Sequence, residues 1–260
     1  MATTRVSVPV ETRAPTGETA AYLLGSDPAL LVDPAAASDA LDTAADEHAV
    51  GHVAVTHHHP DHVGAVARYA DRHGATVWAR TGREGAFERA TGVAPDRTFH
   101  EGTSIPTGDG PVRVLDAPGH APEHVAFAHG GALACGDLAV AEGSVAVAAP
   151  EGDLRAYLTS LRRVRARNPG RLLPGHGPVI EAPRATVERL IAHRLDRERR
   201  VLAAVEGGAR TVAAVCDRVY GKNLTGVRDL AEATVRAHLA KLAVEGRVRW
   251  DPRDDEARPA

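Results

Sequence analysis

This sequence of 260 residues is poor in cysteine, lysine and aromatic side chains. Its two cysteines, Cys135 and Cys216, cannot form a disulfide framework, which indicates the reducing conditions of the cytoplasm. Three Phe, two Trp and four Tyr leave few rings on which nucleic-acid bases could stack. The net charge of −3 also lacks the basic balance that is typical of tight nucleic-acid binding. Composition alone therefore favours a small-molecule substrate over a nucleic acid.

Long apolar runs are also missing. The most apolar stretch, residues 131–150, is interrupted by glycines and carboxylates and is too broken to span a membrane. Residues 1–15 contain no apolar core of signal-peptide length. A hydrophobic content of 43% with 25% charged residues is instead typical of a globular chain that buries a sizeable core. We expect no membrane partner and a cytoplasmic location.

Residues 1–182 alternate short apolar runs with amphipathic ones, which predicts an α/β domain of sheets covered by helices. The predicted strands lie within residues 20–34 (two strands joined by a turn), 52–57, 76–80, 112–120, 124–131, 132–137 and 171–176. The predicted helices are residues 38–47, 62–74, 82–92 and 151–170. The strand-rich part is expected to form the catalytic domain.

From Pro183 the pattern changes, and we expect a second domain over residues 183–260. Helices are predicted at 183–208, 211–221 and 226–247, followed by a short strand at 248–250 and a charged, frayed tail. This order is the outline of a winged helix-turn-helix module. Its third helix carries balanced charges, so a lid or wall for the active site, or a homodimer contact, is supported at least as well as nucleic-acid binding. The basic patch Arg194–Arg200 is interpreted as a solvated helix face.

A dense histidine cluster, His57-His58-His59-Pro60-Asp61-His62, follows the predicted strand at 52–57. Residues two apart at a strand end point the same way, so His57 and His59 can chelate one ion together while His58 points elsewhere. Pro60 then turns the chain, which lets Asp61 and His62 face a second position. Neutral imidazole and carboxylate suit zinc and similar divalent metals.

Three more potential ligands stand in turns directly after predicted strands. They are His120 in a Pro-Gly turn, Asp137 after residues 132–136, and His176 in Pro-Gly-His-Gly. Loops at the strand ends of one sheet converge in space, so the four segments can build one site. The alternative is that these histidines are solvated surface residues, as a lone histidine in a turn usually is. The other histidines outside such turns receive no role: His48, His52, His73, His100, His129, His193 and His238.

The motif His-x-His-x-Asp-His, with His120, Asp137 and His176 after it in order, resembles the metallo-beta-lactamase superfamily. Asp33 in Leu-Leu-Val-Asp-Pro is similar to an aspartate that this family keeps early in its fold. The resemblance extends over the whole chain and implies an αβ/βα sandwich. It further implies that His57, His59 and His120 hold one metal, that Asp61, His62 and His176 hold a second, and that Asp137 bridges them. Asp33 would steady the ligand loop without binding metal.

The resemblance implies a dinuclear zinc hydrolase, with two Zn²⁺ per chain and iron or manganese as alternatives. Two metals roughly 3.5–4 Å apart can share a water and activate it as a bridging hydroxide. Asp61 and Asp137 would therefore take part in catalysis, and no Ser or Cys nucleophile is required. Lactam-hydrolysing members usually carry a basic residue in place of His62 and a cysteine in place of Asp137, so a beta-lactam is not expected as the substrate. A persulfide dioxygenase with a single iron is a minor alternative.

The region after Asp137 resembles the beta-lactamase-like-protein-2 type, in which a winged-helix-like region follows the catalytic domain. That type includes an endoribonuclease acting on single-stranded RNA. On this resemblance, RNA cleavage ranks slightly first among the possible activities. The alternative is a thioesterase or glyoxalase-II-like hydrolase of small molecules, which the composition favours. A DNA-binding regulator using the metal fold as a sensor is a third hypothesis, disfavoured by the complete ligand set. Relatives commonly carry a Gly-Thr-Asn-Thr-Tyr loop facing the site, whereas residues 17–22 here read Gly-Glu-Thr-Ala-Ala-Tyr.

His124, four residues after His120, is a further candidate for catalysis. It could donate a hydrogen bond to an oxygen of the substrate. The alternative that it only supports neighbouring residues is weighed equally.

Overall fold

The computed structural model describes residues 2–221 and 224–260, which form two compact units. The first unit contains the residues up to Ala117, Glu123–Gly143 and Arg167–Thr186. The second contains Pro118–Pro122, Ser144–Ala166 and Val187–Ala260. The predicted division into 1–182 and 183–260 stays a prediction about sequence domains.

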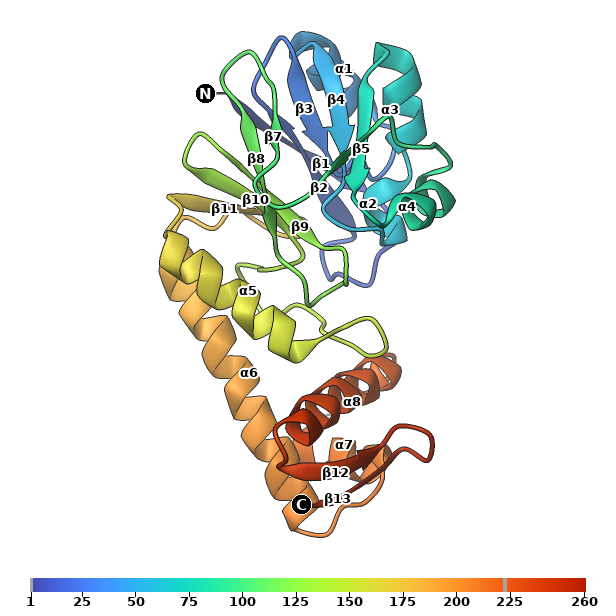
Figure 1. The fold of residues 1–260 in the computed structure, drawn as a ribbon, viewed down its shortest axis with the longest axis vertical. Helices are drawn as coiled ribbons and strands as arrows, with labels where there is room; N and C mark the ends of the chain where they lie inside the picture. The colour runs from blue at the N-terminus through green and yellow to red at the C-terminus, as the bar shows by residue number, and fades with distance from the viewer. Residues whose placement is uncertain (1, 222–223) are drawn as a thin grey trace. The chain divides into compact units, whose positions relative to one another are not determined.

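The first unit contains a six-stranded sheet with its strands in chain order (Figure 1). Its strands are β1 (Thr3–Pro9), β2 (Glu18–Leu24), β3 (Ala29–Val32), β4 (Val50–Ala54), β5 (Thr76–Arg80) and β6 (Arg97–Phe99). The first three strands pair antiparallel, and β3 to β6 pair parallel. Parallel strands covered on both faces read as continuous apolar runs, which is why Val53, Ala54 and Val55 precede the histidine cluster.

A five-stranded sheet has the order β11-β10-β9-β8-β7. Its strands are β7 (Ser104–Ile105), β8 (Val112–Asp116), β9 (Val125–His129), β10 (Ala132–Gly136) and β11 (Arg171–Pro174). All of its pairs are antiparallel except β10 with β11. The parallel pair brings the end of β10 and the end of β11 to one edge, and with them Asp137 and His176.

The two sheets share one hydrophobic core. Tyr22, Leu30 and Trp78 of the first sheet belong to the same buried cluster as Val114 and Phe127 of the second. Complete burial of an aromatic side chain such as that of Phe127 contributes roughly 1.5–3 kcal/mol. A second cluster joins the other face of the first sheet to helices through Leu41, Tyr69 and Phe87. The unit is therefore a sandwich in which helices cover the outer face of the first sheet, and the predicted mixed α/β class is confirmed.

The helices of the first unit begin and end at recognisable signals. They are α1 (Asp39–Glu47), α2 (Pro60–Val63), α3 (Val66–His73) and α4 (Glu84–Thr91). Ser38 caps α1 by accepting a hydrogen bond from the Leu41 N–H, and Gly74 ends α3 in the left-handed conformation with φ 58°. The predicted helix at 62–74 is divided into α2 and α3. Pro60 occupies the first helical position of α2, where its missing N–H costs nothing.

The second unit is mainly helical. It contains α5 (Leu154–Arg167) except for Arg167, the part of α6 (Pro183–Glu206) from Val187 onward, α7 (Val212–Val219), α8 (Arg228–Val244), β12 (Val248–Asp251) and β13 (Glu256–Pro259). One buried cluster joins α6, α7, α8 and the two strands. The three predicted helices and the strand are present, while a winged-helix relationship stays a prediction.

Two expectations about the C-terminal region were wrong. The predicted frayed tail contains β13, which pairs antiparallel with β12 and buries Ala257 completely. The Arg194–Arg200 patch is not simply a solvated face, because Arg194 is only 3% exposed. Its guanidinium lies 5.5 Å from the centre of the Tyr157 ring, and its long side chain fills the interior of the unit.

Within the described part of the chain, no helix combines the length and apolar character needed to cross a membrane. The cytoplasmic location and a homodimer stay predictions.

Candidate metal centre

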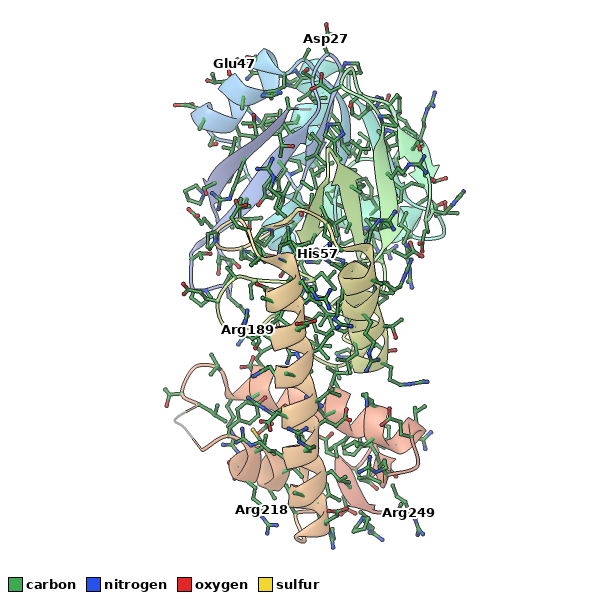
Figure 2. The ribbon with its side chains drawn as sticks, turned by 90° about the vertical axis from the view of Figure 1, so that its left-hand side faces the viewer. Asp27, Glu47, His57, Arg189, Arg218 and Arg249 are labelled. Carbon is green, nitrogen blue, oxygen red and sulfur yellow. The ribbon has the colours of Figure 1, made fainter. Side chains whose placement is uncertain are left out.

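The predicted ligands of the first unit lie at one end of its sheets. His57 and His59 follow β4, and Asp61 and His62 lie in α2. Figure 2 shows His57 at the end of the strands opposite to Asp27, which lies in the turn between β2 and β3. Because the first unit places several strand ends at this edge, loops far apart in the sequence meet here.

Two groups of donor atoms form within this unit. Each group has one nitrogen or oxygen from each member within 4.8 Å of the others: His57, His62 and Asp137 in one, and Asp61, His62 and His176 in the other. His62 belongs to both groups, so the two positions are adjacent. His59 joins them through its Nδ1, which lies 3.0 Å from Nε2 of His57. A spacing of this size allows both nitrogens to face one ion.

His120 lies in Pro118–Pro122, a segment of the second unit. There its Nδ1 lies 2.7 Å from the carbonyl oxygen of Ala146, which orients Nε2 as the atom for a ligand. Both ends of the segment join the first unit, at Ala117 and Glu123, and the Ala117 N–H donates to the His124 carbonyl oxygen at 3.0 Å. Chain connectivity thus keeps His120 within a few residues of β8 and β9, and its place in the site stays a prediction.

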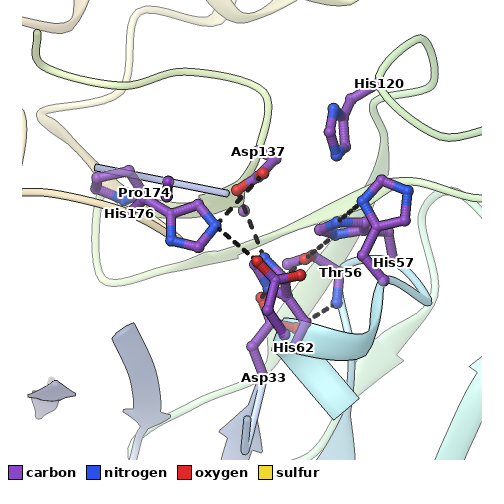
Figure 3. Close-up of polar contacts among 12 residues, drawn as sticks. Asp33, Thr56, His57, His62, His120, Asp137, Pro174 and His176 are labelled. Atoms are coloured by element: carbon purple, nitrogen blue, oxygen red, sulfur yellow. Dashed lines mark hydrogen bonds and ion pairs between the residues drawn. The ribbon is translucent and has the colours of Figure 1, made fainter. Parts of the chain in front are cut away.

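The buried carboxylate of Asp33 supports the site from below (Figure 3). Its Oδ1 accepts a hydrogen bond from the Thr56 N–H at 2.6 Å, and its Oδ2 accepts one from the Thr56 hydroxyl at 2.8 Å. The same Oδ2 lies 3.0 Å from Nδ1 of His62. Asp33 therefore fixes both the start of the histidine cluster and the ring in its centre, as the sequence predicted.

The rings of His57, His62 and His176 share one orientation. In His62, Nδ1 faces Asp33; in His176, Nδ1 lies 2.9 Å from the Glu18 carbonyl oxygen; in His57, Nδ1 lies 3.0 Å from the Thr56 hydroxyl. The outer nitrogen is thus held by an oxygen and Nε2 faces the cluster, an arrangement typical of metal-binding histidines.

The donor set fits divalent metal ions. Nε2 of His62 is buried, makes no hydrogen bond, and lies 3.6 Å from Oδ1 of Asp137. Leaving a buried imidazole nitrogen without a hydrogen bond is costly, so a ligand at this point would remove a penalty. Nε2 of His176 similarly lies 3.5 Å from Oδ2 of Asp61 and 3.6 Å from Oδ2 of Asp137. Three imidazoles and two carboxylates around one small volume are the ligands that zinc and related metals prefer.

The electrostatics of the cluster are those of an anionic site. Burial of His62 disfavours its protonated form, but the negative charges of Asp33, Asp137 and Asp61 outweigh burial and raise its pKa to about 9. The pKa of His176 is also raised: burial lowers it, while the hydrogen bond with Asp61 and the charge of Asp137 have the larger combined effect. Burial would raise the pKa of Asp61, but hydrogen bonds from His176 and Thr12 overcome it and hold this pKa well below its ordinary value. The site attracts positive charge, whether protons or metal ions.

Two glycines make room for these side chains. A Cβ on Gly175 would lie 2.6 Å from Cε1 of His62 and 2.8 Å from Oδ1 of Asp137. A Cβ on Gly136 would lie 2.4 Å from the Thr56 hydroxyl, and its φ of 46° is in the left-handed region that favours glycine. The Gly-Asp and Gly-His pairs in the sequence thus reflect the close packing of the site.

His124 and His58 lie beside the ligands. His124 is fully buried, and its Nε2 accepts a hydrogen bond from the Asp137 N–H at 3.1 Å. This contact orients the Asp137 backbone, and a direct contact between His124 and substrate stays a prediction. His58 belongs to none of the donor groups among the described residues, and its N–H donates to Glu123 at 3.1 Å.

Sequence reasoning missed the contribution of β1, β2 and the turn between them. The Thr12 hydroxyl donates to Oδ2 of Asp61 at 2.5 Å, and the Tyr22 hydroxyl donates to the Pro174 carbonyl oxygen at 2.8 Å. The Ala20 N–H donates to the Gly175 carbonyl oxygen at 2.8 Å. Of the segment Gly17–Tyr22, in which a strand was expected from Ala20, Glu18–Tyr22 belong to β2 and hold the His176 turn. Tyr22 was the one residue of that segment that could have indicated its contribution to the site from the sequence.

The chain is similar to known proteins over most of its length. A family model described as the metallo-beta-lactamase superfamily matches residues 14–176. The chain is 32% identical over 214 residues to a beta-lactamase-like protein 2 homolog of Drosophila melanogaster, covering 78% of this chain and 72% of the relative. It is 34% identical over 217 residues to a hydroxyacylglutathione hydrolase of Methylococcus capsulatus, covering 78% and 80%. A solved structure of a metallo-beta-lactamase family protein from Thermus thermophilus has the same fold, with a TM-score of 0.78, 24% identity, and coverage of 99% and 98%.

Proposed function

The chain belongs to the metallo-beta-lactamase superfamily as a hydrolase of the beta-lactamase-like protein 2 type, and we propose that it is a two-zinc hydrolase of small thioesters. The observation that carries the proposal is the pair of donor groups that share His62. Because His62 belongs to both groups, the groups are adjacent, and two ions held there would lie next to each other rather than in separate structural sites.

Each ion has its own set of donors in this proposal. His57, His59 and His120 would hold the first ion, Asp61, His62 and His176 would hold the second, and Asp137 would lie between the two. The contacts of His176 with Asp61 and Asp137, and of His62 with Asp137, support this division. The orientation of Nε2 in His120, fixed by the Ala146 carbonyl oxygen, supports its inclusion.

When bound, such a metal pair supplies an activated water and polarises the bond that is attacked. The protein positions the donors: Asp33 holds His62 and Thr56, Glu18 holds His176, and His124 holds the backbone of Asp137. Cys135 is not a candidate nucleophile. It is fully buried, and burial together with the charge of Asp137 raises its pKa to about 12, so that almost no thiolate exists at neutral pH.

A thioester is proposed ahead of RNA as the substrate. The relative from Methylococcus capsulatus is named as a hydroxyacylglutathione hydrolase, and its 34% identity extends over most of both chains. The net charge of −3 is no obstacle for a small thioester, whereas it offers little general attraction to a polyanion. Cleavage of single-stranded RNA is the second candidate, supported by the resemblance to the beta-lactamase-like protein 2 type.

The test uses two substrates and one matched pair of variants. Purified protein loaded with zinc is incubated with S-lactoylglutathione and, separately, with labelled single-stranded RNA. We expect thioester turnover that is lost in Asp61→Asn and retained in Asp71→Asn, which alters an exposed carboxylate of α3. RNA cleavage with the same dependence on Asp61, and no thioester turnover, would establish the second candidate instead. If Asp61→Asn keeps whichever activity the wild type has, that result would contradict the two-zinc mechanism.

A further inference from the structure

A loop that the sequence did not associate with the metal centre contacts one of its carboxylates. Residues 10–17 connect β1 to β2, and Thr12 in this loop is half-buried. Its hydroxyl donates a hydrogen bond to Oδ2 of Asp61 at 2.5 Å. The same Oδ2 lies 3.5 Å from Nε2 of His176, so Thr12 reaches the carboxylate oxygen that faces the second donor group.

The direction of this hydrogen bond is fixed by the loop itself. The Thr12 oxygen also accepts a hydrogen bond from the Ala14 N–H at 3.1 Å, so the hydroxyl hydrogen is directed to Asp61. The Gly17 N–H donates to the Ala14 carbonyl oxygen, and the Val10 N–H donates to the Gly17 carbonyl oxygen, both at 3.2 Å. The loop is therefore closed at its base and organised by its own hydrogen bonds.

We propose that Thr12 is a positioning residue for Asp61, and that it sets the affinity of the second metal position. This inference rests on the proposed function, because it takes Asp61 as a metal ligand. The Asp61 side chain lies on a four-residue helix and can rotate between several orientations. The hydrogen bond from Thr12 reduces the number of these orientations in the metal-free protein, so less conformational freedom is lost when a metal ion binds. Hydrogen bonds from neighbouring residues orient metal ligands, and their removal typically lowers metal affinity by about 10- to 100-fold.

Position 43 provides a matched control in the first unit. Thr43 in α1 is exposed, and its hydroxyl donates to the Asp39 carbonyl oxygen at 2.9 Å rather than to a residue of the metal centre. Thr12→Val and Thr43→Val thus remove one hydroxyl each at nearly constant volume. Thr12→Ser keeps the hydroxyl at position 12 and tests rescue.

The experiment measures zinc binding directly. Metal-free wild-type protein and the three variants are titrated with zinc in competition with a chromophoric chelator, and thermal unfolding of each metal-free protein is followed by circular dichroism. We expect Thr12→Val to bind one of the two zinc ions about 10- to 100-fold less tightly, with the affinity for the other ion and the metal-free unfolding midpoint unchanged. Thr12→Ser and Thr43→Val should bind both ions as the wild type does.

Two results would overturn the assignment of Thr12. One is unchanged affinity for both ions in Thr12→Val, and the other is an equal loss in Thr43→Val, which would indicate a general effect of removing a threonine hydroxyl. Uptake of fewer than two ions by the wild type would contradict the proposed function itself, and the wild-type titration therefore separates the two failures.

Discussion

Asp33 and His62 form a buried contact in which Oδ2 of the carboxylate lies 3.0 Å from Nδ1 of the ring. Asp33 is 1% exposed and His62 is 0% exposed, so water cannot replace either partner. The contact leaves Nε2 of His62 directed toward Asp137. A residue that is not itself in a donor group thus determines how the shared imidazole is presented.

Replacing Asp33 tests this relationship. Asp33→Asn keeps the shape of the side chain but removes the charge that favours Nδ1–H on His62. We expect zinc affinity to fall by about 10- to 100-fold, measured by competition with a chelator. Asp27→Asn, in an exposed turn of the first unit, is the control and should bind zinc as the wild type does. Equal affinities in all three proteins would show that Asp33 has only a structural role.

Gly175 tests how tightly the site is packed. In Gly175→Ala the new Cβ would lie under 3.0 Å from both His62 and Asp137, so one of these side chains must move. We expect zinc stoichiometry, measured by mass spectrometry of metals, to fall in this variant. Gly85→Ala in α4 has room for its Cβ, is expected to stabilise the helix by roughly 0.5–1 kcal/mol, and should keep full metal content. Wild-type metal content in Gly175→Ala would mean that the site adapts more freely than its packing indicates.

Tyr22 links the fold to the site through the Pro174 carbonyl oxygen. Tyr22→Phe removes only the hydroxyl and leaves a buried carbonyl without this donor, at a cost of about 1–3 kcal/mol. The midpoint of thermal unfolding of the metal-free protein should fall by several degrees. Tyr220→Phe, whose ring lies 4.0 Å from the Arg197 guanidinium carbon in the second unit, is the comparison and should change the midpoint less. A larger fall of the unfolding midpoint in Tyr220→Phe than in Tyr22→Phe would contradict the stabilising role of the Tyr22 hydroxyl.

The second unit should lose stability in acid through His238. This side chain is 0% exposed, neither ring nitrogen makes a hydrogen bond, and burial is the main cause that lowers its pKa to about 3. The positive charges of Arg194, Arg197 and Lys241 act in the same direction, with a smaller contribution from His193. Glu198, whose carboxylate lies 2.7 Å from Lys241, compensates part of this charge.

The sign follows from proton uptake. Between pH 6.5 and about 3 the unfolded chain binds a proton at position 238 that the folded unit does not. The contribution of His238 to the free energy of unfolding is thus fully present above pH 6.5. It falls with decreasing pH by at most about 1.4 kcal/mol per pH unit. Urea unfolding between pH 4 and 8 should show a weaker dependence on pH in His238→Gln than in the wild type. The same slope in both proteins would assign acid sensitivity to other groups.

The sequence was sufficient to predict the α/β class because its apolar runs and turns are clear. The ligand candidates stood out because each one follows an apolar strand in a turn containing Pro or Gly. The first strand was missed, since Thr3–Pro9 has only Val6 and Val8 as buried residues and its pattern is weak.

Long-range contacts explain the other differences. The segment 251–260 is highly charged and reads as a tail, but Asp255 pairs with Arg236 at 2.5 Å and Ala257 packs into the core of the second unit. Thr12 and Glu18 have no recognisable motif, because their roles come from where the β1–β2 connection lies in space. Contacts of this kind depend on the folded sandwich and have no local signal.

The content of metal per chain tests the central claim most directly. Zinc should be measured by mass spectrometry in purified wild-type protein, in His62→Ala and in His58→Ala, with activity measured on the same samples. We expect two ions per chain in the wild type and in His58→Ala, and at most one in His62→Ala with loss of hydrolysis. A fully active wild-type protein with one ion or none, or two ions retained by His62→Ala, would contradict a two-metal centre in which His62 holds one of the ions.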